Sequence, residues 1–120
     1  MHEKIFEIAA YALYASEAEQ PILDTLISAA EAELTARLRA GITPEDCGNL
    51  YIVAASLLAE AEMLLLRSVD ETEQFTAGEV SVRQSREKAA AAAAALRRQA
   101  NGLMAPFLKD DSFAFMGVQG

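Results

Sequence analysis

Two pairs of carboxylates are the first candidates for chemistry in this sequence. Glu31 with Glu33, and Glu60 with Glu62, offer the residue types that share a proton as general acid and general base. Residues two positions apart on a helix point to different sides, so neither pair forms a ready dyad. We therefore predict no catalytic carboxylate.

The sequence also lacks the residue patterns of a metal site and of an activated nucleophile. A di-metal site in a helical bundle needs Glu-x-x-His pairs, which the one histidine, His2, cannot provide, and the serines lack a histidine base. Gly78 and Gly102 belong to no phosphate-binding run. Cys47 falls in the first turn of a predicted helix, where the dipole could lower the pKa of its thiol, but we interpret it as a small, half-buried residue. We predict no enzyme activity, no cofactor and no metal.

The totals describe one acidic domain. A chain of 120 residues with 52% hydrophobic residues can bury a single core, so we assign residues 1–120 to one domain. The net charge of −8 argues against a general attraction to nucleic acid or to an anionic membrane. A single cysteine excludes an internal disulfide, and no charged-then-apolar leader opens the sequence. We expect the protein to stay in the cytoplasm of the cell that makes it.

The stretch that must organise the fold is a predicted central helix over residues 44–67. Thr43 is a good N-cap and Pro44 suits the first turn, while residues 50–66 are apolar on almost every side. A membrane span is the alternative, but the apolar run is shorter than about 18 uncharged residues and holds Glu60 and Glu62. We predict a helix surrounded by companions.

Two helices precede it. Residues 3–15 carry Ile5, Ile8, Ala9, Ala12 and Leu13 on one stripe. A capping box from Ser16 to Glu19 would place Pro21 inside a helix, so we predict a loop there and a second helix over 21–40, ended by a left-handed Gly41.

The pattern changes after residue 67. An extended arm is predicted over 68–84, where a turn at Ala77 and Gly78 precedes alternating Val80 and Val82; a short β-hairpin strand and a surface loop anchored by Phe75 are equally weighted. The last helix, over 85–105, contains seven consecutive alanines that allow a neighbour to approach closely. The expected fold class is all-α, a four-helix bundle-like single domain with this arm or hairpin and an extended C-terminal tail over 106–120.

Apolar residues of the tail need a partner surface. They are expected to fold back onto the arm of the same subunit, to cover a neighbouring subunit, or, as we favour, to contact both. Basic residues gather on the last helix: residues 1–79 carry 15 acids and 4 bases, whereas residues 80–120 carry 3 acids and 6 bases. A solvated face, a head-to-tail contact with the acidic part of the next subunit, and a track beside DNA remain open as explanations. The predicted subunit or partner contacts are Phe75, Val80, Val82, Arg83, Arg86, Arg97, Arg98, Phe107, Phe113, Phe115, Met116 and Val118.

The order of parts resembles the small all-α head-to-tail connector (neck adaptor) proteins of tailed bacteriophages and prophages. The resemblance covers nearly the whole layout and rests most on LISAAEAEL at 26–34, FTAGEVSV at 75–82 and the closing LMAPFLKDDSFAF. The sequence departs from that family in its plain alanine helix and its markedly acidic first part.

The resemblance implies a structural role. It suggests an oligomeric ring that joins portal to tail-completion proteins, with arms that engage neighbours, no membrane partner, and at most transient contact with DNA in the channel. The expected location is the cytoplasm of a bacterial host, and the virion if the phage is functional. The alternative is a cytoplasmic helical protein-binding module that acts as a regulatory partner.

Overall fold

The computed structural model describes the backbone of residues 1–74 and 79–109, and the side chains of residues 1–69 and 83–109. Over these residues the chain is helical, without strands apart from one isolated bridge, which confirms the all-α class. The elements are α1 (His2–Leu13), α2 (Gln20–Arg37), α3 (Pro44–Cys47), α4 (Asn49–Gln74), α5 (Glu79–Met104) and the 3-10 turn η1 (Ala105–Phe107).

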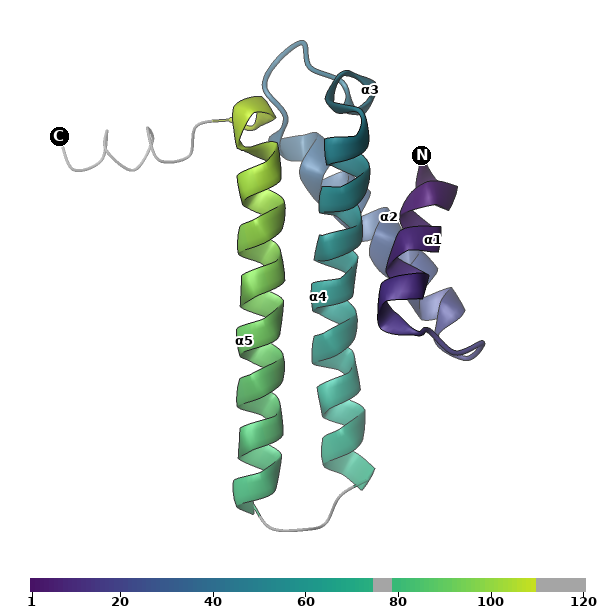
Figure 1. Ribbon diagram of the computed structural model, residues 1–120, viewed down its shortest axis with the longest axis vertical. Coiled ribbons are helices and arrows are strands. Elements are labelled where there is room, and N and C mark those ends of the chain that lie inside the picture. Colours follow the sequence, from purple (N-terminus) through teal and green to yellow (C-terminus); the bar gives the residue numbers. More distant parts are fainter. Residues whose placement is uncertain (75–78, 110–120) are drawn as a thin grey trace, which may run out of the picture.

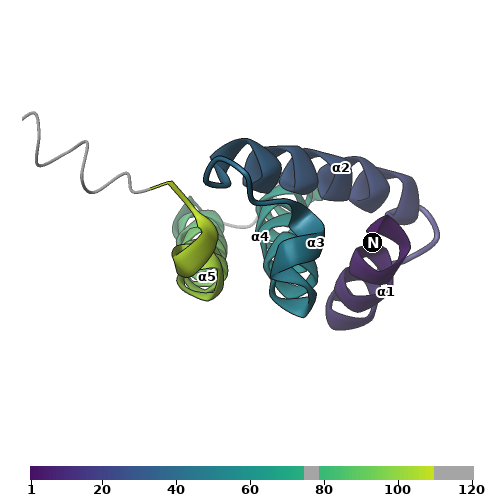
Figure 2. The ribbon, with the colours of Figure 1, turned by 90° about the horizontal axis from the view of Figure 1, so that it is seen from above.

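The four long helices form a layer of three that is crossed by the fourth. Figure 1 shows α4 and α5 as a long antiparallel hairpin, with α1 on the other side of α4. Figure 2 shows α5, α4 and α1 in a row and α2 lying across one face of that row. The opposite face of the row is therefore not covered by α2.

Alanines occupy buried positions on both helices of the α4–α5 hairpin. Ala93 and Ala100 of α5 are buried, and Ala54 and Ala61 of α4 are fully buried. Small side chains at these positions let two helices pack at short range, as the alanine run predicts. Met104 closes the same side of α5 with a fully buried side chain.

The segment that we expected to be an extended arm is mostly helical. Residues 68–74 continue α4, and residues 79–84 belong to α5, while residues 75–78 lie outside the described part of the chain. Val80 and Val82 thus lie on helical backbone. Residues 68–74 lack the apolar stripe of a buried helix, but their Glu and Gln residues are good helix formers, so the polar sequence does not end α4.

The central helix begins later than predicted. Thr43 and Asp46 do form a reciprocal capping box: the Thr43 N–H donates to Asp46 Oδ2 at 2.8 Å, and the Asp46 N–H donates to Thr43 Oγ1 at 3.3 Å. This cap starts only the single turn α3, because Gly48 adopts φ 59° and ψ −132° and breaks the helix before Asn49. Such a backbone conformation favours glycine.

The chain between α1 and α2 also differs from the prediction of a plain loop. Ser16 and Glu19 form the capping box that we had rejected, with the Ser16 N–H donating to Glu19 Oε1 at 3.1 Å and the Glu19 N–H donating to Ser16 Oγ at 3.3 Å. The turn it closes ends before α2, so Pro21 still falls in the first turn of that helix, where no N–H is needed.

The first residues of the predicted tail are part of the fold. Leu38 follows α2 in extended conformation and forms an antiparallel bridge with Leu108, so α2 ends at Arg37 and not at residue 40. The Arg39 N–H donates to the Phe107 carbonyl and the Lys109 N–H donates to the Arg37 carbonyl, each at 2.9 Å. Leu108 is 6% exposed. The chain that we expected to leave the bundle at residue 106 is therefore held on it as far as Lys109.

More than half of the most apolar part of α4 is buried within the protein. Residues Asn49–Val69 are long and apolar enough to cross a membrane by length and composition, a longer stretch than the sequence reading allowed. In this fold 56% of the most apolar part is buried against other helices. Such burial is the behaviour of a core helix that is covered on most, but not all, of its sides.

Candidate interaction surface

One side of α4 is apolar and only partly covered by the rest of the chain: Leu50 and Val53 are exposed, whereas Leu57 is 9% exposed. Leu50, Val53, Leu57, Glu60 and Leu64 follow one another at intervals of three or four residues, so they lie along a single side. We call these five residues the open stripe. It faces away from α2, as the neighbouring Tyr51 demonstrates.

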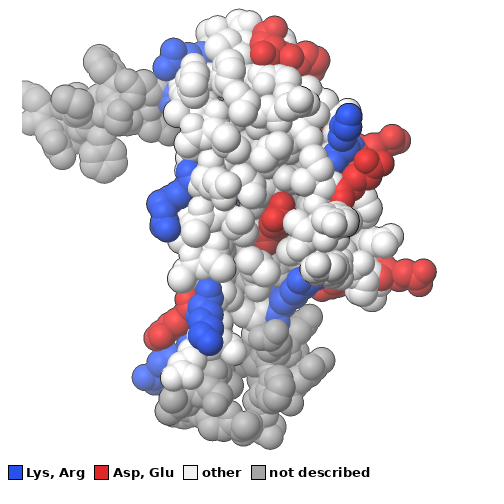
Figure 3. All heavy atoms as spheres, viewed as in Figure 1, with Lys and Arg blue, Asp and Glu red and all other residues white. Residues whose placement is uncertain are grey.

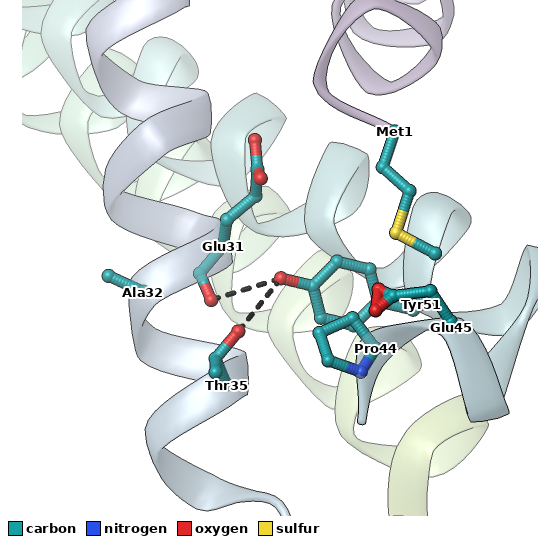
Figure 4. A pocket seen from close by; sticks show the side chains of 7 residues that line it. All are labelled: Met1, Glu31, Ala32, Thr35, Pro44, Glu45 and Tyr51. Atoms are coloured by element: carbon teal, nitrogen blue, oxygen red, sulfur yellow. Dashed lines mark hydrogen bonds between the residues drawn. The ribbon is translucent and has the colours of Figure 1, made fainter. Parts of the chain in front are cut away.

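Tyr51 is fixed against α2. Its hydroxyl donates to the Glu31 carbonyl at 3.1 Å and lies 3.0 Å from Thr35 Oγ1, and Figure 4 shows it pointing at both groups. Val53, two residues further, is rotated by about 200° around the helix and so points to the other side.

Exposure follows this geometry. Tyr51 is 2% exposed, whereas Leu50 is 39% and Val53 is 36% exposed. Ile8 of α1 is 37% exposed, and Leu96 and Leu103 of α5 are only partly buried. Figure 3, seen from the face opposite α2, shows a mainly uncharged surface over the upper parts of α4 and α5. A surface of this kind is typical of a protein contact.

Glu60 is the one ionisable residue of the open stripe. Burial raises the pKa of its carboxyl above the ordinary value, while a hydrogen bond from Ser56 opposes the shift. Ser56 is itself 1% exposed and its hydroxyl also lies 2.8 Å from the Val53 carbonyl. A partner that brings a cation or a hydrogen-bond donor to Glu60 would stabilise its charged form.

Charge is distributed along the two edges of this face. Basic side chains stand mainly along the α5 edge and acidic ones mainly along the α1 edge (Figure 3). Arg83, Arg86 and Arg98, which we predicted as contacts, are exposed on α5. Glu3 and Glu7 are exposed on α1.

Arg97 has a different place from the other predicted arginines. Its guanidinium lies 3.1 Å from Glu62 Oε1 of α4 and 3.4 Å from Glu33 Oε2 of α2. It therefore ties α5 to two helices of its own chain. Arg97 is thus paired with acidic residues of its own chain, and no second subunit is needed to balance its charge.

The predicted apolar contacts are placed unevenly. Phe107 is partly buried against the core of its own chain, through the bridge that holds residues 105–109. The side chains of Val80 and Val82 lie outside the described residues. So do Phe75, Phe113, Phe115, Met116 and Val118 as a whole.

Sequence reasoning missed the open stripe because it predicted a fully surrounded helix. It also missed His2, which lies 2.6 Å from Asp24 Oδ1 and 2.5 Å from Glu31 Oε1. The two acids are seven positions apart, a spacing that places both on one side of α2 and is the only local signal for this contact.

A shallow hollow lies beside Tyr51. It has a volume of about 570 Å³ and is lined by Met1, Glu31, Ala32, Thr35, Pro44, Glu45 and Tyr51 (Figure 4). The Tyr51 hydroxyl is already engaged by α2, so the hollow presents mainly carboxylates and apolar side chains.

Cys47 is 5% exposed and burial raises the pKa of its thiol, which makes it a packing residue.

Comparison with known proteins gives no relative. No family model, curated protein or solved structure matches this chain. Within the described residues, no group of three or more His, Cys, Asp and Glu side chains is placed to hold a metal ion.

Proposed function

We propose that this protein is a structural adaptor of a phage or prophage particle. It assembles as an oligomeric ring and joins the portal to tail-completion proteins. The observation that carries the proposal is the open stripe: an apolar side of the central helix on which Leu50 and Val53 stay more than a third exposed. The layout of the sequence supplies the resemblance to neck adaptors, and the stripe supplies a surface for assembly.

The stripe suits packing against a helix of another subunit. Leu50 and Val53 are the exposed members of the stripe and lie one turn apart, so a helix of a second subunit can pack against both. Covering a Leu or Val that is more than a third exposed removes apolar surface from water, at about 25 cal/mol per Å². The flanking Ile8, Leu96 and Leu103 widen the contact.

The two charged edges favour a head-to-tail arrangement. The basic α5 edge and the acidic α1 edge are different surfaces of one chain, so each complements the other on a neighbouring copy. Contacts of this heterologous kind close into a ring when the rotation between subunits permits. The hairpin then stands as a spoke of the ring, in the bacterial cytoplasm during assembly and in the finished virion.

The second candidate is a cytoplasmic helical protein-binding module that acts as a regulatory partner. The few exposed apolar residues of the open stripe favour it, because a single amphipathic helix of a partner is enough to cover Leu50 and Val53. No self-association is expected in that case.

Co-expression with a candidate phage portal protein separates the two. The adaptor proposal predicts a co-purified complex with ring-shaped particles in negative-stain images. Failure to bind the portal, together with a monomer at high concentration, would refute it.

A further inference from the structure

The imidazole of His2 in α1 lies between two carboxylates of α2, and we call this pair of contacts the clasp. Its Nε2 lies 2.6 Å from Asp24 Oδ1 and its Nδ1 lies 2.5 Å from Glu31 Oε1. Asp24 and Glu31 are separated by two helical turns, so the imidazole is held along the same side of α2 from both of its nitrogens. The His2 side chain is 37% exposed, which leaves it in reach of solvent protons.

With both carboxylates ionised, this geometry favours a charged imidazole. A neutral imidazole carries one N–H and one acceptor nitrogen, so it can donate to only one of the two carboxylates. The other nitrogen would then place a lone pair against carboxylate oxygen. Only the imidazolium donates to Asp24 and Glu31 together.

The negative charges of Glu31 and Asp24 also favour the imidazolium. Glu3 and Glu7 of α1 line a hollow together with His2 and Asp24, and Glu45 of α3 lines the adjoining hollow with Glu31. On α4, Glu62 pairs with Arg97 and Arg67 pairs with Glu19. The hydrogen bonds to Asp24 and then Glu31 raise the pKa of His2 above its ordinary value of 6.5, against a smaller opposing effect of burial.

The clasp holds one end of α1, and a separate contact holds the other. At the far end, Arg67 donates to the Leu13 carbonyl at 2.8 Å, and arginine keeps its charge at all ordinary pH values. Between the two ends, Ile5, Ala9 and Leu13 are buried. Loss of the clasp therefore loosens the first turns of α1 while its last turn stays attached.

We propose that His2 is a pH-dependent latch, which fastens the first turns of α1 to α2 when it is protonated and releases them when it loses its proton. Release gives access to the side of α2 next to Asp24 and Glu31. This inference concerns the packing of α1 alone and does not depend on the proposed function.

The chain's single histidine makes the test direct. NMR titration of the His2 imidazole is expected to give a pKa above 6.5, and Asp24→Asn and Glu31→Gln are each expected to lower it. A titration at or below 6.5 in the unaltered protein would overturn the proposal.

Amide hydrogen exchange tests the release itself. The Ile5 N–H, which donates to the Met1 carbonyl at 3.1 Å, reports on the first turn of α1. After correction for intrinsic exchange, its opening constant is expected to rise roughly tenfold as pH increases through the His2 pKa, the loss of about one charge-assisted hydrogen bond. His2→Gln is expected to open to the same extent at every pH. Equal pH dependence in both proteins would show that the histidine is not the latch.

Discussion

Tyr51 and Val53 stand two residues apart on α4 and face opposite sides of the molecule. Tyr51 is 2% exposed and bonded to α2, whereas Val53 is 36% exposed on the side that α2 leaves open. The same helix is thus both the centre of the fold and, in our proposal, its contact with other chains. The two roles are separable by mutation, because each uses different residues.

Tyr51→Phe tests the role of α4 in the fold. The substitution keeps the ring but removes the hydroxyl that bonds to the Glu31 carbonyl and Thr35. We expect the free energy of unfolding to fall by about 1–2 kcal/mol, since the Glu31 carbonyl and the Thr35 hydroxyl each lose a partner. Urea denaturation measures it. Tyr11→Phe, at a site that is 83% exposed, is the matched control and should change stability little.

Glu19 should govern the acid limit of stability. Arg67 donates to both of its carboxylate oxygens at 2.8 Å, and these bonds, with the Ser16 N–H, lower the pKa of Glu19 to about 2. A lowered pKa stabilises the fold above the ordinary value near 4.5, and that stabilisation is lost as pH falls from there toward 2. Glu19→Gln should cost about 1–2 kcal/mol at pH 7, because both partners are partly exposed and screened.

The pH profile checks this prediction. Chemical denaturation between pH 2 and pH 7 should show a smaller decline for Glu19→Gln than for the unaltered protein. The exposed neighbour Glu17 provides the control: Glu17→Gln should keep the original profile. A Glu19→Gln protein with the full acid decline would contradict the assignment.

Arg97 and its neighbours should separate stability from assembly. Arg97→Ala removes the link from α5 to Glu33 and Glu62, so we expect a loss of about 0.5–1.5 kcal/mol that shrinks at high salt. Arg98→Ala, at the adjacent exposed position, is the matched control for stability. The double variant Arg83→Ala with Arg86→Ala should leave the unfolding free energy nearly unchanged and weaken assembly. If instead Arg97→Ala weakened assembly and the double variant lowered the unfolding free energy, the subunit contact would lie at Arg97.

The end of the chain allows a further division. If residues 110–120 act between subunits, their removal should leave helical content and thermal midpoint near those of the full chain. Removal of residues 107–120 also deletes Leu108, which is buried and bridged to Leu38, and should cost about 2–4 kcal/mol. If the last eleven residues contact a neighbouring copy as well as their own chain, as we expect from the sequence, the shorter deletion alone weakens assembly. Assembly that it leaves undiminished would assign them no role between subunits.

Local sequence rules predicted the elements that depend on neighbouring residues. Ile5, Ala9 and Leu13 of the predicted stripe are buried, whereas Ile8 and Ala12 at its side are exposed. The Thr43 cap and the position of Pro21 follow from rules that act within one turn. The close approach of α5 through Ala93 and Ala100 follows from the volume of alanine. In these cases the residue type and its immediate context are sufficient.

The features that sequence reasoning missed depend on distant partners. The bridge between Leu38 and Leu108 shortens α2, yet neither residue carries a strand pattern of its own. The clasp of His2 joins positions 22 and 29 residues apart. The open stripe is a consequence of where α2 crosses, because the residues of α4 are nearly equally apolar on the covered and the open sides. Each of these required the tertiary arrangement.

The mass of the protein in solution, before and after a charge is placed on the open stripe, tests the central claim most directly. Light scattering should give the unaltered protein a mass several times the 12.9 kDa of one chain, and Val53→Glu should reduce it to one chain while its helical content is kept. Ile22→Glu, at an aliphatic site of α2 that is 47% exposed, should leave the assembly intact. An unaltered protein of 12.9 kDa at high concentration, or a Val53→Glu protein of undiminished mass, would contradict the account.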